Sequence, residues 1–194
     1  METMNNKKRT TGKNIPKRGF TLVEVLVSIS ILVVAITAPL VFVSASVSYG
    51  RTAKYETTAT YLAQEAIEAL RNERDRATLN GGGWGGFLSA LGSPSASCFS
   101  ASGCLVDVAA QLESPAAAPL ISACSGACSI LYKNSITNLY SYRSSPPWAP
   151  TTFTRTVKVV SIDANELKIT SIVSWATTTG TSQTTLTEFL RNWQ

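Results

Sequence analysis

The sequence predicts an α+β protein in which one long N-terminal helix precedes a C-terminal antiparallel sheet. Three observations support this. Residues 20–43 form a nearly unbroken apolar run, apolar residues then recur at helical spacing over residues 44–79, and apolar and polar residues alternate after Pro150. A period of 3.6 residues is typical of a helix, and a period of two is typical of a strand. A chain of 194 residues allows one modest domain with a real core.

The basic charge of the chain is concentrated at its N-terminus. Residues 1–18 contain six basic residues and one acid, which leaves 11 of each sign in the rest of the chain. The remainder has no large basic field to attract nucleic acid, so a nucleic-acid partner is not favoured. Basic residues that precede an apolar segment stay in the cytoplasm. Residues 1–19 are therefore predicted to be a cytoplasmic leader, with the C-terminal part outside the cytoplasm.

The apolar run over residues 20–43 has the length of a membrane-spanning helix. At about 1.5 Å per residue it matches a hydrocarbon core of roughly 30 Å. A cleaved secretory signal ending at Ala45 is one interpretation, but its apolar core would be only about 7–15 residues long. An ordinary signal anchor is a second interpretation. Neither explains Gly19 before the run or Glu24 near its start.

A third interpretation uses those two residues. Residues 17–26 read Lys-Arg-Gly-Phe-Thr-Leu-Val-Glu-Val-Leu. This segment resembles the prepilin processing motif of the type IV pilin and type II secretion pseudopilin superfamily. The resemblance implies that a prepilin peptidase cleaves between Gly19 and Phe20 and methylates the new Phe20 amine. It also implies a pilin-like fold, a lipid bilayer before assembly, and other pilin subunits and a membrane assembly platform as partners.

Glu24 is an acidic residue inside the predicted membrane segment. An ionised carboxylate at the centre of a bilayer costs about 2.5–3.5 kcal/mol on insertion scales, so such a residue usually has a partner. The Phe20 amine lies one helical turn away. The resemblance implies that Glu24 pairs with this amine on an adjacent subunit; the alternative is a carboxylate that reaches the membrane interface alone. Pro39, late in the run, is predicted to kink the helix.

An amphipathic helix is predicted over residues 44–79. Its apolar stripe has i, i+3, i+4, i+7 spacing and consists of Ala59, Leu62, Ala63, Ala66, Ile67 and Leu70. The stripe should pack on a sheet. Asn80-Gly81 is a plausible stop after Leu79.

Residues 80–150 are predicted to be a loop-rich insert that carries all four cysteines. Residues 80–103 are rich in Gly and Ser and are expected to be loop. Cysteines outside the cytoplasm favour disulfides, and four of them allow three pairings. The short spacings favour Cys98–Cys104 and Cys124–Cys128. A zinc site is the alternative, although its usual two-residue gaps are absent.

Residues 151–194 are predicted to form a three-stranded antiparallel meander. Phe153, Val157 and Val159 alternate with polar residues, with Arg155 on the otherwise apolar face, and turns are expected near Asp163 and Gly180. The turn residues Asp163, Asn165 and Glu166 could also be calcium ligands, but a hairpin turn needs the same residue types.

The predicted function is structural: a filament subunit of a type IV pilus, membrane-anchored by a single pass before it joins an extracellular filament. The tail, with Phe-x-Arg-x-Val-x-Val from Phe153, resembles minor pilins and pseudopilins and favours a minor over a major subunit. A secretion pseudopilin, or a tip adhesin or DNA-capture pilin, remains the alternative. An enzyme is not expected, because a chain without histidine has no Ser-His or Cys-His nucleophile system. Neither a cofactor nor a metal is predicted.

Overall fold

A computed structural model describes residues 19–92, 97–113, 119–178 and 180–193. The chain divides into two compact units, Met1–Tyr49 and Gly50–Gln194. One helix, α1 (Leu22–Leu79), contributes residues to both units. All other helices and strands of the described residues belong to the second unit, which is called the head below.

Helix α1 has a defined cap at each end. At its start, the Oγ1 atom of Thr21 accepts a hydrogen bond from the backbone N–H of Glu24 at 3.2 Å, as an N-cap residue does. At its end, Gly81 adopts a φ of +77°, a left-handed conformation that favours glycine, and its N–H donates to the carbonyl of Thr78. The predicted helix end at residues 79–81 is confirmed. Pro39 lies inside α1, which continues past it.

The head continues from α1 with short helices and strands. Those elements are α2 (Gly83–Gly92), β1 (Cys104–Val106), α3 (Val108–Glu113), β2 (Ile121–Ala123), β3 (Ile130–Asn134), β4 (Tyr140–Ser141), β5 (Trp148–Ser161), β6 (Glu166–Thr177) and β7 (Gly180–Arg191). The loop predicted over residues 80–103 is wrong for Gly83–Gly92, which is α2. Trp84, Phe87, Leu88 and Leu91 have i, i+3, i+4, i+7 spacing, and the burial of this apolar face outweighs the helix-weakening effect of the glycines.

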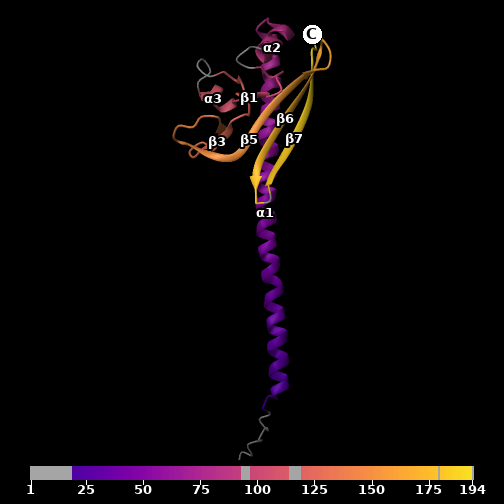
Figure 1. Cartoon of the computed structure of the whole chain (residues 1–194), viewed down its shortest axis with the longest axis vertical. Helices are drawn as coiled ribbons and strands as arrows, with labels where there is room; N and C mark the ends of the chain where they lie inside the picture. The colour runs from indigo at the N-terminus through magenta and orange to yellow at the C-terminus, as the bar shows by residue number, and fades with distance from the viewer. Residues whose placement is uncertain (1–18, 93–96, 114–118, 179, 194) are drawn as a thin grey trace, which may run out of the picture. The chain divides into compact units, whose positions relative to one another are not determined.

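The strands of the described residues form one seven-stranded antiparallel sheet. The strands β5, β6 and β7 are the long ones and lie side by side in that order (Figure 1). Strand β5 also pairs with β1 and β3, which carry the short outer strands β2 and β4. The α+β class and the C-terminal antiparallel sheet are therefore as predicted. The sheet is larger than the predicted meander, because residues before Pro150 supply four further strands and the start of β5.

The core lies between α1 and the inner face of the sheet. All six residues of the predicted stripe, from Ala59 to Leu70, are buried. They pack in two clusters against inward-facing residues of β5 and β6, among them Phe153 and Trp175 in one and Val157 and Ile169 in the other. Burial along β6 alternates strictly from Leu167 to Trp175, which confirms the predicted period of two. Burial of this apolar area is the main driving force that holds the head together.

Candidate functional site

The predicted cleavage position lies just outside the first residue of α1. Gly19, Phe20 and Thr21 have no regular secondary structure, and Leu22 begins the helix. Phe20 is 80% exposed, and a side-chain atom added at Gly19 would meet nothing within 4 Å. The peptide bond between Gly19 and Phe20 therefore lies outside the helix, between two exposed residues.

Glu24 lies in the first turn of α1, where an acidic residue interacts favourably with the helix dipole. Thr21 and Glu24 have the spacing of a capping box, and the Thr21 half of that motif is formed. The role of Thr21 was not predicted from the sequence, although Thr three residues before Glu is a recognised start signal. The pairing of Glu24 with the amine of another subunit involves a second molecule and stays a prediction.

The described residues of the first unit expose many large apolar side chains. Those described between Phe20 and Val43 are 45–80% exposed. Among the described residues, no helix meets the combined length and hydropathy criteria for a membrane-spanning segment. The kink expected at Pro39 also stays a prediction.

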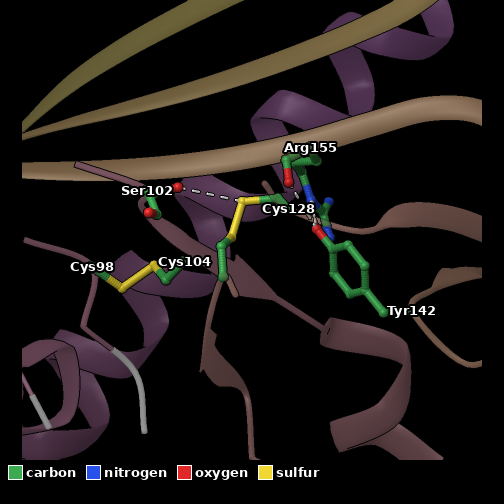
Figure 2. The surroundings of a disulfide bond; sticks show 7 residues. Cys98, Ser102, Cys104, Cys128, Tyr142 and Arg155 are labelled. Carbon is green, nitrogen blue, oxygen red and sulfur yellow. Dashed lines mark hydrogen bonds between the residues drawn. A yellow bond between two sulfur atoms is a disulfide. The ribbon is translucent and has the colours of Figure 1, made fainter. Parts of the chain in front are cut away.

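The four cysteines form two disulfides in the head (Figure 2). Cys98 is bonded to Cys104, and Cys124 is bonded to Cys128, which are the within-pair bridges that the spacing favours. Cys98 and Cys104 are fully buried in the larger core cluster, whereas the other pair is half-buried at the surface. The Sγ atom of Cys128 lies 3.6 Å from the carbonyl oxygen of Ser102, a residue between Cys98 and Cys104 in the sequence, so the two disulfides lie near each other.

The segment between Cys98 and Cys104 lies directly against β5. Gly103 has a φ of +73°, and an added Cβ atom would come within 2.5 Å of the carbonyl oxygen of Val157. The N–H of Val159 donates to the carbonyl of Cys98 at 3.1 Å. The disulfide therefore closes a tight loop that only glycine permits at position 103.

A buried arginine connects α1 to the sheet. The side chain of Arg155, on β5, is 0% exposed and donates to the carbonyl oxygen of Leu62 at 2.9 Å and to the carboxylate of Glu65 at 2.7 Å, both on α1. It also donates to the carbonyl oxygen of Val106 on β1 and to the hydroxyl of Tyr142, toward which it points in Figure 2. Each of the three guanidinium nitrogens thus donates at least one hydrogen bond, so the charge that breaks the apolar alternation of β5 is buried with partners.

The electrostatics of this arginine cluster favour its protonated forms. Burial disfavours the charged guanidinium, but Tyr142 and the Glu65 carboxylate outweigh it, so the pKa of Arg155 is raised above its ordinary value. Burial raises the pKa of Tyr142, and the opposing attraction of Arg155 only partly offsets the effect. Tyr142 is therefore a neutral phenol in the folded head at physiological pH.

Asp107 is a second polar anchor, which the sequence analysis missed. Its Oδ1 atom accepts the N–H of Ala110 at 3.0 Å and so caps α3, while Oδ2 accepts the hydroxyl of Ser141 at 2.7 Å and the N–H of Tyr142 at 3.1 Å. One carboxylate thereby fastens α3 to β4. An aspartate directly before a short apolar segment was the available signal.

The acidic turn between β5 and β6 has intramolecular partners. The Oδ1 atom of Asp163 accepts the N–H of Asn165 at 2.7 Å, and Glu166 accepts a hydrogen bond from Arg191 at 2.6 Å. The first contact is the side-chain hydrogen bond expected of an Asx turn, and the second is a cross-strand pair between β6 and β7. Across the described ranges, no group of three or more His, Cys, Asp or Glu side chains is arranged to hold a metal ion.

Comparison with known proteins identifies the N-terminal segment. Residues 16–38 match the family model described as the prokaryotic N-terminal methylation motif, which is the prepilin-type signal of type IV pilins and pseudopilins. No curated protein and no solved structure matches the chain significantly. The motif supports a type IV pilin-like or pseudopilin-like protein, with processing by prepilin peptidase and membrane anchoring before assembly with other pilins.

Proposed function

We propose that this chain is a minor subunit of a type IV pilus, processed between Gly19 and Phe20 and then incorporated into an extracellular filament. The methylation motif at residues 16–38 is the observation that carries the proposal. The fold supports it, because one helix runs from the motif into a disulfide-bearing head whose sheet packs on that same helix. A pilin-like protein requires no catalytic residues, and its chemistry is limited to processing and assembly.

Processing can be tested at the glycine. The mature protein should begin at a methylated Phe20, and Gly19→Leu should leave the precursor intact in the membrane fraction. Gly50→Leu is the matched control, since an added Cβ meets nothing within 4 Å at either position. Mass spectrometry of the mature N-terminus decides the matter; a chain that begins at Ser46 would identify a secretory signal instead.

The proposal places residues 20–43 in the membrane before assembly, with the leader in the cytoplasm and the head outside it. The exposed apolar side chains of the first unit are suited to a lipid environment. A cysteine reagent that does not cross membranes should label a cysteine introduced at Tyr61 but not one introduced in residues 1–18. Peptide mapping of the cellular protein without reduction should recover the Cys98–Cys104 and Cys124–Cys128 disulfides. Four free thiols would contradict the placement of the head in an oxidising compartment.

Glu24 is proposed to act in assembly. Glu24→Ala removes an unfavourable charge from the membrane, so insertion should be unchanged or easier. Incorporation should fail, because the Phe20 amine of a neighbouring subunit loses its acidic partner. The ratio of variant protein in sheared filaments to that in the membrane is the measurement, with Glu56→Ala, an exposed site on the same helix, as the control. Normal incorporation of Glu24→Ala would exclude the charge pair while leaving the processing proposal intact.

A further inference from the structure

Strand β7 is a long edge strand. It pairs with β6 over its whole length, in twelve consecutive register pairs from Glu166–Arg191 to Thr177–Gly180 without a bulge. In the described part of the chain no strand pairs with its other side (Figure 1). The outer strands at the far end of the sheet are different, because β2 has three residues and β4 has two.

Edge strands usually carry features that prevent pairing with other chains, such as prolines, bulges, charges or short length. Strand β7 has none of these over residues 180–187, which are Gly-Thr-Ser-Gln-Thr-Thr-Leu-Thr. Its two charged residues are both engaged, Glu188 with Arg71 and Arg191 with Glu166. The main-chain N–H and C=O groups on the outer side of β7 are therefore available to pair with a further strand.

A hollow lies beside this edge, between β7 and α1. It has a volume of about 400 Å³, and its apolar lining comes from Ile67 on α1 and Leu186 on β7. A strand added to an edge directs every second side chain to the same face of the sheet. The side chains of a strand paired with β7 that face α1 would therefore reach this hollow. An edge strand beside a side-chain pocket is the arrangement by which proteins recognise extended peptides.

The polar rim of the hollow carries an excess of negative charge. Arg71 forms ion pairs with both Glu68, at 2.5 Å, and Glu188, at 2.9 Å, so two carboxylates share one guanidinium. All three side chains are partly exposed and within reach of a ligand. Gln64 adds a neutral polar group. A cationic side chain next to the hollow would complement this rim.

We propose that the β7 edge and this hollow form a docking site for an extended strand of another polypeptide. The occupant carries an aliphatic side chain that enters the hollow over Ile67 and Leu186. Two residues along, on the same face, it carries a lysine or arginine that meets the carboxylates of Glu68 and Glu188. Main-chain pairing with β7 supplies affinity, and the two side chains supply selectivity. The site does not depend on the processing motif.

The probe is a short blocked peptide of threonines that carries one valine and, two residues later, one lysine. With the full chain in detergent micelles, binding should saturate and should slow hydrogen exchange at amides of β7. The same peptide with N-methylated backbone amides should bind at least about tenfold more weakly, because it cannot pair with the edge. No saturable binding up to millimolar peptide, equal binding of the N-methylated peptide, or slowed exchange at β2 and β4 rather than β7 would each refute the site.

Variants of the rim test the selectivity. In the wild type, a peptide with glutamate in place of lysine should bind about two- to fivefold more weakly, as expected for exposed ion pairs. Glu68→Lys should reverse that preference, and Glu56→Lys, the same charge change elsewhere on the exposed surface of α1, should preserve it. Gln64→Trp, which fills the hollow from an exposed position, should abolish binding while tryptophan emission shows a folded head. A preference that Glu68→Lys leaves unaltered would rule out the proposed occupant.

Discussion

Replacement of Arg155 by methionine tests whether the buried arginine holds α1 on the sheet. Methionine matches the length of the arginine stem but cannot donate hydrogen bonds. The change removes the hydrogen bonds that Arg155 donates to the carbonyl oxygens of Leu62 and Val106, and a hydrogen bond from a charged donor contributes about 1.5–3 kcal/mol. It also removes a buried charge whose desolvation opposed folding. We expect Arg155→Met to lower the free energy of unfolding of the head by about 2–4 kcal/mol.

Glu65→Ala perturbs the same ion pair from the other side and should be at least as costly. The Glu65 side chain is 32% exposed and can turn to water when its partner is removed, whereas the Arg155 side chain is 0% exposed and cannot. Removal of the glutamate therefore leaves an uncompensated buried charge, which typically costs about 3–5 kcal/mol. The two effects should not add in the double variant, because both break the same pair.

Denaturant unfolding followed by tryptophan emission measures these changes. All four tryptophans lie in the head, so the signal reports that unit in the full chain in detergent micelles. A stable domain has about 5–15 kcal/mol in total, so losses of this size are readily detected. The reasoning would be refuted if Glu65→Ala cost under about 1 kcal/mol, or if Arg155→Met cost clearly more than Glu65→Ala.

Two further changes probe the packing of the head. Gly103→Ala should lower the free energy of unfolding by about 3 kcal/mol or more, because it combines a positive φ with a clash against the backbone of Val157. Gly126→Ala should lower it by only about 1 kcal/mol, because Gly126 has a φ of +84° and an added Cβ atom would meet nothing within 4 Å. Equal losses for the two variants in thermal or denaturant unfolding would contradict this reasoning. Because burial raises the pKa of Tyr142, its contribution to stability is fully present below the unfolded pKa of about 10 and is lost as pH rises through the folded pKa. The free energy of unfolding should therefore fall above about pH 10, and less steeply in Tyr142→Phe; identical slopes would exclude the tyrosine as a cause.

The long elements were predictable because their periodicity is strong. The stripe from Ala59 to Leu70 and the alternation from Leu167 to Trp175 each have one apolar face, and each buries that face against the other. Burial of apolar area determines both patterns, so the sequence contains the information directly. The end of α1 was equally clear, since Gly81 supplies the left-handed residue that a helix terminus requires.

The short elements of the head were not predictable in the same way. Strands of two or three residues, such as β2 and β4, are too short to show a period. Their positions depend on contacts distant in sequence, such as the hydrogen bonds that Asp107 accepts from Ser141 and Tyr142. Helix α2 did carry a readable apolar spacing, but the glycine content of residues 80–86 concealed it. In that segment the apolar spacing, and not the glycine content, determines the local structure.

Two charged residues interrupt otherwise apolar patterns. One is paired within the chain, and the other is proposed to pair between chains. Arg155 breaks the alternation of β5 and finds its acidic partner, Glu65, within the same chain. Glu24 breaks the apolar run of the first unit, and its proposed partner is the amine of another subunit. A charge paired within the chain contributes to folding, whereas a charge paired between chains contributes to assembly. Substitution of Glu65 should therefore change the unfolding of the head, and substitution of Glu24 should leave that unfolding unchanged while it prevents incorporation into filaments.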